Sequence, residues 1–227
     1  MNAAQLAARY PTLYHMAEDE SWPGIREHGL LSTTALLDLY GYEGAARREV
    51  ESEWRSRKHI LTKVGLPDAV VRDQLPMSPT NLAPILDDGL SPEDWYEVIN
   101  KKIFFWPTVE DLHTFLAAKE YKNAAHVVIS VPTARLMERH VDQVTLSAIN
   151  SGSTYYNPER SNGPPRRGRA TFQPIDAFAG ARVKEVVVQY GIADLVGLGP
   201  TVEQWIAHRK NYDRPSFELL GRIWPTP

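Results

Sequence analysis

Short runs of hydrophobic residues recur along the chain, and polar turns separate them. Runs of this length, rich in β-branched and aromatic residues, are typical of buried strands. The last run places a single carboxylate, Glu185, at the rim of an otherwise apolar segment. The pattern predicts strands over residues 13–17, 30–32, 59–64, 69–74, 103–106, 125–131, 141–149 and 183–190.

Helix signals alternate with these strands. Ser21 stands at a capping position, Pro23 lies in the first turn and Gly29 follows the last turn, so residues 22–28 are predicted to form a short helix. Start signals and spacing predict further helices over residues 33–39, 42–58, 78–86, 91–100, 108–119 and 201–210. The helix over 42–58 is expected to be a charged appendage, because few of its positions are apolar.

Strands and helices mix along the whole chain, with no internal repeat, no low-complexity linker and no break in composition. We therefore expect a single domain over residues 1–227 of α+β class, with strands and helices intermixed. One segment lacks order signals, since Asn, Ser, Gly, Pro and Arg dominate residues 150–174. Loops of that length in compact domains are usually functional or disordered.

Composition narrows the possible chemistry. The chain has 227 residues and no cysteine, which excludes disulfides, thiolate metal sites and cysteine nucleophiles. Its seven histidines show no H-E-x-x-H spacing, so no metal is expected. The net charge of -3 offers no whole-protein attraction for nucleic acid, and any such contact must be local.

No apolar stretch approaches the roughly 20 residues that a membrane span needs, and the start of the chain lacks the basic and apolar regions of a secretion signal. We therefore expect a cytoplasmic protein. A P-loop motif is absent, and the glycines at 197 and 199 form a poor dinucleotide fingerprint because Pro200 follows them.

The remaining candidates for chemistry are scattered along the predicted strands: His15 in the first, Arg72 in a middle one, and Glu185 in the last. Each has a simple structural interpretation. His15 fits a hydrogen-bonded core histidine, and Arg72 beside Asp73 fits an edge ion pair. Glu185 is harder to explain in this way, because a buried carboxylate costs several kcal/mol or acquires a raised pKa.

The order of these residues resembles the ADP-ribosyltransferase fold, most closely the DarT-type branch of bacterial toxins. The motifs that carry the resemblance are Tyr14-His15-Met16, Gly29-Leu30-Leu31, an arginine, the strand Phe104-Phe105-Trp106, and Glu185-Val186-Val187-Val188. Ala17 stands where that branch carries threonine. The longer motifs L-Y-H-M-A and H-G-L-L-S are also similar to an uncharacterised bacterial family, and that similarity implies no activity.

The transferase resemblance implies a split β-sheet core with peripheral helices and an NAD+ cleft between the sheets. In it, Glu185 would stabilise the oxocarbenium-like transition state, His15 would hold a ribose or the nicotinamide amide, and Arg72 would orient the diphosphate. NAD+ would be the substrate, with no metal. The residues expected to contact it are His15, Tyr14, Ser32, Tyr40 and Phe105, with Trp106 as another aromatic that could stack on the nicotinamide.

The loop over 150–174 would recognise the acceptor, because this fold carries its target loop just before the glutamate. Local positive charge from Arg160, Arg166, Arg167 and Arg169 would suit a phosphate-bearing target such as single-stranded DNA or RNA. The residues expected to contact it are Asn150, Ser151, Ser153, Arg166, Arg167 and Arg169. A toxin of this type would also have an antitoxin partner.

Three alternatives to transfer onto nucleic acid stay open. NAD+ glycohydrolysis and RNA 2′-phosphotransfer would use the same fold and the same glutamate. A non-catalytic module that binds a nucleotide or a protein would instead leave Glu185 in solvent, paired with Lys184 or Arg182, and would bury His15 with no cavity nearby.

Overall fold

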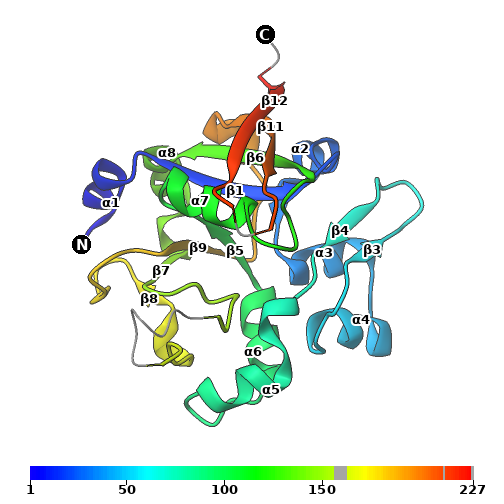
Figure 1. Cartoon of the computed structure of the whole chain (residues 1–227), viewed down its shortest axis with the longest axis vertical. Coiled ribbons are helices and arrows are strands. Elements are labelled where there is room, and N and C mark those ends of the chain that lie inside the picture. Colours follow the sequence, from blue (N-terminus) through cyan, green and yellow to red (C-terminus); the bar gives the residue numbers. More distant parts are fainter. Residues whose placement is uncertain (156–162, 212, 226–227) are drawn as a thin grey trace.

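The computed structural model describes residues 1–155, 163–211 and 213–225, so Arg160 of the predicted target loop lies outside the described residues. Two four-stranded antiparallel sheets form its centre, and helices surround them (Figure 1). The α+β class expected from the sequence is therefore confirmed, and helices and strands alternate along the described chain.

The first sheet has the order β1-β6-β11-β12. Its strands are β1 (Thr12–Glu18), β6 (Ala125–Pro132), β11 (Thr201–His208) and β12 (Ser216–Trp224). The continuous apolar run in β6 fits its central position, because both of its faces are covered. The β11–β12 hairpin projects from the body at the top of Figure 1.

The second sheet has the order β5-β9-β7-β8. Its strands are β5 (Lys102–Phe105), β9 (Glu185–Gln189), β7 (Val144–Ser147) and β8 (Gln173–Pro174). An isolated antiparallel bridge between Tyr14 and Trp106 joins β1 of the first sheet to the end of β5. The two sheets therefore meet at the strands that carry His15 and, one strand further, Glu185.

The main core lies between the two sheets. Leu13, Val127 and Ile129 of the first sheet and Phe105 and Val186 of the second are fully buried in one cluster. Burial of each such side chain stabilises the fold by roughly 1.5–3 kcal/mol relative to exposure. This apolar contact explains why short apolar runs in the sequence predicted β1, β5, β6 and β9.

Helices cover the ends and the outer face of the first sheet. Leu6 of α1 (Ala3–Arg9) and Leu136 of α8 (Thr133–His140) extend the main core, and Trp22 of α2 (Trp22–His28) joins it. On the other face, Leu112 and Leu116 of α7 (Val109–Leu116) pack in a second cluster with Met16 and Val128.

A lateral part of the molecule, on the right and bottom of Figure 1, is built on two smaller clusters. One contains residues of α3 (Thr33–Tyr40), α4 (Gly44–Glu51), β3 (His59–Leu61) and β4 (Ala69–Val71). The other contains residues of α5 (Pro79–Leu82) and α6 (Pro92–Asn100). A short pair formed by β2 (Leu30–Leu31) and β10 (Gly191–Ile192) links this part to the segment after β9.

Several sequence predictions were wrong in detail. The predicted helix over 201–210 is the strand β11, and the charged helix predicted over 42–58 is helical over Gly44–Glu51. Ser21 does not cap α2 through its side chain, because its hydroxyl donates to the carbonyl oxygen of Glu18 (2.6 Å). The sequence interpretation missed α1, α8 and β12.

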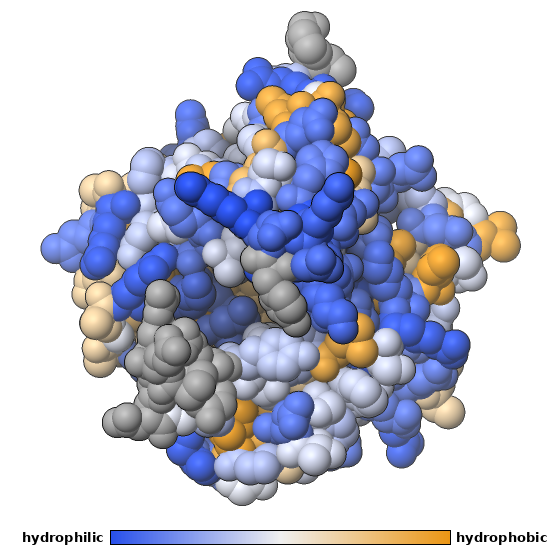
Figure 2. Space-filling view, in the orientation of Figure 1, coloured by the Kyte–Doolittle hydropathy of each residue, from blue (hydrophilic) through white to orange (hydrophobic). Residues whose placement is uncertain are grey.

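None of the described helices is long and apolar enough to cross a membrane. Figure 2 shows hydrophobic colour over the β3–β4 hairpin, which carries the exposed Ile60 in β3 and Val64 in its connecting turn, and over the projecting β11–β12 hairpin, where Leu219 and Leu220 are exposed.

Candidate functional site

A cavity of about 410 Å³ opens where the two sheets and the lateral part meet, and His15, Arg72 and Glu185 all line it. This volume lies in the range of small-molecule sites. A smaller cavity of about 180 Å³ adjoins it and is lined by His15 and Arg72 as well. These two side chains therefore stand at the junction of a cleft with two chambers.

The order of neighbouring strands explains why His15 and Glu185, which are far apart in the sequence, line the same cavity. The bridge between Tyr14 and Trp106 places β1 beside β5, and the pairing of Phe105 with Val186 places β9 on the other side of β5. Neighbouring strands lie about 4.8 Å apart, so the main chains of β1 and β9 are separated by roughly 10 Å at this level. An elongated ligand can reach both His15 and Glu185.

His15 is a neutral imidazole with a defined tautomer. Its Nδ1 lies 2.9 Å from the carbonyl oxygen of Phe104, and a carbonyl only accepts, so Nδ1 carries the proton. Burial lowers the pKa of His15 to about 4, and the charge of Arg72 acts in the same direction against the bond to Phe104. At neutral pH, Nε2 is therefore an acceptor without a hydrogen bond to any of the described residues, on a side chain of the cavity wall.

Arg72 is held on three sides at the junction of the two chambers. Its Nη2 donates to Nδ1 of His126 (3.1 Å), its guanidinium lies over the ring of Tyr121 (4.9 Å to the centroid), and its Nε is 3.5 Å from Oε2 of Glu18. The buried Nη1 has no hydrogen-bond partner among the described residues. A fixed guanidinium with a free donor suits an anionic group such as a diphosphate.

His126 fixes this arrangement, and sequence reasoning gave it no role. Its Nε2 donates to the carbonyl oxygen of Tyr121 (2.9 Å), which leaves Nδ1 as the acceptor for Arg72. Burial lowers the pKa of His126, so the neutral form that accepts this bond is maintained at neutral pH.

Glu185 is 4% exposed and begins β9 at the cavity wall. Its Oε1 accepts from the backbone N–H of Ser151 (3.1 Å), whereas Oε2 forms no hydrogen bond within the described chain. Burial raises the pKa of its carboxyl group to about 7, against the lowering effect of Ser151 beside it. The ion pair with Lys184 or Arg182 that a non-catalytic module would need is not formed, because both cations bind Asp111 instead.

Asn150, Ser151 and Ser153 line the same cavity as Glu185, and their predicted contact with the acceptor stays a prediction. Ser151 is fully buried, and its hydroxyl makes no hydrogen bond to any residue that the structure describes. Two buried polar atoms on this side of the cavity, Oγ of Ser151 and Oε2 of Glu185, therefore have no hydrogen-bond partner within the described chain.

Arg167 was wrongly predicted to contact the target. It is 1% exposed, and its guanidinium donates to the carbonyl oxygens of Ser151 (3.4 Å), Asn150 (3.2 Å) and Pro165 (2.6 Å), and to that of Ser153. These bonds hold the loop that positions Ser151 against Glu185. Arg167 is thus a clamp inside the protein.

The other two arginines are exposed and do not line the cavity. Nε of Arg166 pairs with Asp87 (2.5 Å), and the backbone N–H of Arg169 donates to Asp88 (2.7 Å). Contact of their side chains with a large target stays a prediction.

Two of the aromatic side chains that were predicted to contact NAD+, Phe105 and Tyr14, do not face the cleft. Phe105 is fully buried in the main core and packs beside the His15 ring (5.7 Å between centroids), so it cannot stack on a ligand. Tyr14 packs on the outer face of the first sheet with the α7 cluster and lines neither cavity. Tyr40 lines the smaller chamber, whereas Phe104 and Trp106 line the larger one.

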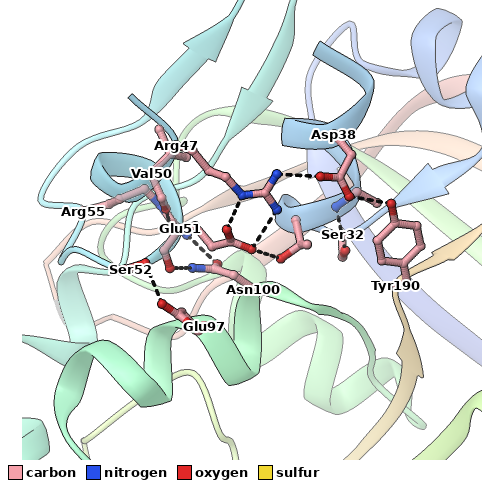
Figure 3. A network of polar contacts seen from close by, with 12 residues as sticks. Ser32, Asp38, Arg47, Val50, Glu51, Ser52, Arg55, Glu97, Asn100 and Tyr190 are labelled. Carbon is pink, nitrogen blue, oxygen red and sulfur yellow. Dashed lines mark hydrogen bonds and ion pairs between the residues drawn. The ribbon is translucent and has the colours of Figure 1, made fainter. Parts of the chain in front are cut away.

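Ser32, which was predicted to contact NAD+, lines the larger chamber, and its hydroxyl accepts from the backbone N–H of Ala35 (3.2 Å) and caps α3. Figure 3 shows this cap beside a polar network that joins α3, α4 and α6. In it, Arg55 donates to Oδ1 of Asn100 (3.1 Å), and Nδ2 of Asn100 donates to the carbonyl oxygen of Glu51 (2.7 Å). Arg55 and Asn100 also line the cavity, but their hydrogen bonds serve the protein itself.

No group of His, Asp and Glu side chains within residues 1–155, 163–211 and 213–225 could hold a metal ion. The model of a family described as a family of unknown function, DUF7002, matches residues 11–198, which include His15, Arg72 and Glu185. No curated protein and no solved structure matches the chain significantly.

Proposed function

Because the chain belongs to the DUF7002 family, whose function is unknown, we infer its activity from its own cleft and propose that it is an NAD+-dependent mono-ADP-ribosyltransferase. The observation that carries the proposal is the buried carboxyl group of Glu185, with one free oxygen, in the same cavity as a neutral His15 and a fixed Arg72. These residue types in this order also carry the sequence resemblance to ADP-ribosyltransferases.

In the proposed reaction, the bond between ribose C1′ and the nicotinamide nitrogen breaks, and nicotinamide leaves with the bonding electron pair. The acceptor nucleophile forms the new bond to C1′, and its proton passes to Glu185. Positive charge develops on the ribose during this step, and an anion beside it in a water-poor site stabilises the transition state. Oε2 of Glu185 is the free anionic oxygen for this purpose.

The other two side chains would bind and orient the substrate. Nε2 of His15 would accept a hydrogen bond from a ribose hydroxyl or from the nicotinamide amide, which the neutral tautomer permits. Nη1 of Arg72 would donate to the diphosphate. The position of both side chains at the junction of the two chambers suits a dinucleotide that extends through both.

For the acceptor, we propose single-stranded DNA or RNA. Asn150 and Ser153 lie on the cavity wall beside Glu185, where an incoming nucleophile must arrive. The exposed Arg166 and Arg169 would supply the local positive charge that a phosphate backbone requires. A role as a toxin with an antitoxin partner, and a place in the cytoplasm, stay predictions.

NAD+ glycohydrolysis is the second candidate, and the pKa of Glu185 favours it. A carboxyl group with a pKa of about 7 suits a general base near neutral pH, so water would be activated as readily as a target hydroxyl. RNA 2′-phosphotransfer is less favoured, because acidic residues balance the basic ones along the cavity wall.

The test incubates the protein with adenine-labelled NAD+ and single-stranded DNA, single-stranded RNA or mixed proteins. We expect label on the nucleic acid, and loss on the order of 100-fold or more in Glu185→Ala. Glu138→Gln, an exposed glutamate on α8, is the matched control and should keep full activity. Free ADP-ribose without labelled acceptor would indicate the glycohydrolase instead, and no binding of NAD+ at millimolar concentration would contradict both.

A further inference from the structure

Gln74 is a buried amide whose hydrogen-bonding capacity is unused. Its side chain is 4% exposed and lines the larger chamber. Neither Oε1 nor Nε2 has a partner among the residues that the structure describes. Buried polar groups are almost always paired, so an amide with both ends free at a cavity wall indicates a ligand that supplies the partners.

The main chain around Gln74 is firmly held, which fixes the origin of its side chain. Its backbone N–H donates to the carbonyl oxygen of Arg55 (2.7 Å). Its own carbonyl oxygen accepts from Nε1 of Trp54 (2.9 Å) and from the backbone N–H of Met77 (2.8 Å). A side chain on so rigid a support is suited to recognition.

The wall that carries Gln74 is joined to the loop beside Glu185. Two residues after Gln74, the carbonyl oxygen of Pro76 accepts from both the backbone N–H (3.0 Å) and the hydroxyl (2.6 Å) of Thr154. The same loop carries Ser151, whose N–H binds Glu185 (3.1 Å). Gln74 therefore belongs to the Glu185 end of the cleft, where the leaving group must lie.

The chemistry of each free group at this wall selects a different part of a ligand. Arg72 only donates and carries charge, and the ionised Glu185 only accepts. Gln74 offers a donor and an acceptor side by side on a neutral planar group, which matches a second planar group with the same pair. A primary carboxamide has this pattern, and a carboxylate cannot supply its donor.

We propose that Gln74 recognises the carboxamide of the nicotinamide ring through a pair of amide–amide hydrogen bonds. This inference rests on the proposed function and adds the source of its substrate specificity. Nε2 of Gln74 donates to the carboxamide oxygen, and Oε1 accepts from the carboxamide nitrogen. The site consequently selects NAD+ over the dinucleotide that carries a carboxylate in place of the amide.

The experiment measures by calorimetry how the full chain binds NAD+ and nicotinic acid adenine dinucleotide. The wild type should bind NAD+ at least about 10-fold more tightly, because the carboxylate leaves Oε1 without a donor and brings a negative charge against it. In Gln74→Leu the affinity for NAD+ should fall and the ratio should approach one. Gln143→Leu, which alters an exposed glutamine outside the cavity wall, should keep the wild-type ratio.

Thermal unfolding separates recognition from a structural role. Replacement of an unpaired buried amide by an apolar group of similar size should leave the midpoint unchanged or raise it. Gln74→Met provides a second variant with the same expected result. An unchanged ratio in both variants, or a clear drop in the midpoint of both, would overturn the role of Gln74. If the wild type bound neither dinucleotide, the proposed function itself would fail.

Discussion

The carboxyl group of Glu185 forms no ion pair with its sequence neighbour Lys184. Lys184 directly precedes it in the sequence but pairs with Asp111 (2.5 Å), so burial dominates at Glu185 and raises the pKa of its carboxyl group to about 7. The folded state therefore binds this proton more tightly than the unfolded state, in which the pKa is near 4.5. Stability linked to Glu185 is present at low pH and is lost as the pH rises to about 7.

Substitution of Glu185 by glutamine should remove this loss. The free energy of unfolding of Glu185→Gln, relative to the wild type, should increase by roughly 3 kcal/mol between pH 4.5 and pH 8. Denaturant titrations of both proteins at several pH values measure it. The difference in unfolding free energy between the two proteins cancels the contributions of the other titratable groups. His15 is one of them, and its lowered pKa changes the stability in the opposite direction below pH 6.5. A difference that does not vary with pH would mean that Glu185 is not a buried acid.

The two adjacent arginines at 166 and 167 should differ sharply in their contribution to stability. Arg167→Gln should lower the free energy of unfolding by about 3 kcal/mol or more, because several buried carbonyl oxygens lose their donor. Arg166→Gln removes an exposed ion pair and hydrogen bonds to the carbonyl oxygens of Pro84 (3.3 Å) and Leu86 (2.8 Å) at the surface, and it should cost clearly less, about 1 kcal/mol. Chemical denaturation measures both, and equal effects would contradict the clamp.

The sequence could not distinguish these two arginines. A run of cations in a polar segment suggests a binding surface, and only the folded chain reveals that Arg167 donates to the carbonyl oxygens of Asn150, Ser151 and Ser153. Successive side chains of a strand point to opposite faces of the sheet, so Phe104 lines the cavity whereas Phe105 lies in the core. Gln74 carried no signal beyond its place two residues after Arg72, because an unpaired amide is a property of the three-dimensional structure.

At the scale of elements, local signals worked where they were chemically specific. A helix was predicted from Ser91, and α6 begins there with a capping box that Ser91 and Asp94 form. They failed for β11, because Val202, Trp205 and Ile206 fit a helical spacing as well as a strand. Pairing with β6 on one side and β12 on the other decides the conformation of this segment, and no local pattern contains those partners.

The cap of α6 provides a test at this scale. Ser91→Ala should destabilise the protein by about 1 kcal/mol, since the serine hydroxyl accepts from the backbone N–H of Asp94 (3.1 Å). Ser78→Ala, at the start of α5, is a matched control because its side chain makes no capping bond. Thermal or denaturant unfolding compares the two variants. Similar losses in both would show that the cap contributes nothing specific.

At the scale of the whole molecule, the cleft depends on contacts between distant parts of the chain. His15 and Glu185 line the same cavity because β1, β5 and β9 are neighbours, and Arg72 comes from the lateral part, one residue after the end of β4. Sequence order alone, through the family resemblance, predicted that the three residues share a cleft. The second chamber and the balance of charge along the wall required the folded structure, because many elements contribute to them.

The central claim is that this cleft breaks the glycosidic bond of NAD+ with Glu185 beside the ribose. The most direct measurement is the rate of release of labelled nicotinamide from NAD+ at pH 8, where Glu185 is ionised, with single-stranded DNA or RNA present. We predict that the wild type releases nicotinamide on the order of 100-fold or more faster than Glu185→Gln. Equal rates in the two proteins, or no release by the wild type with any acceptor or with water, would contradict the claim.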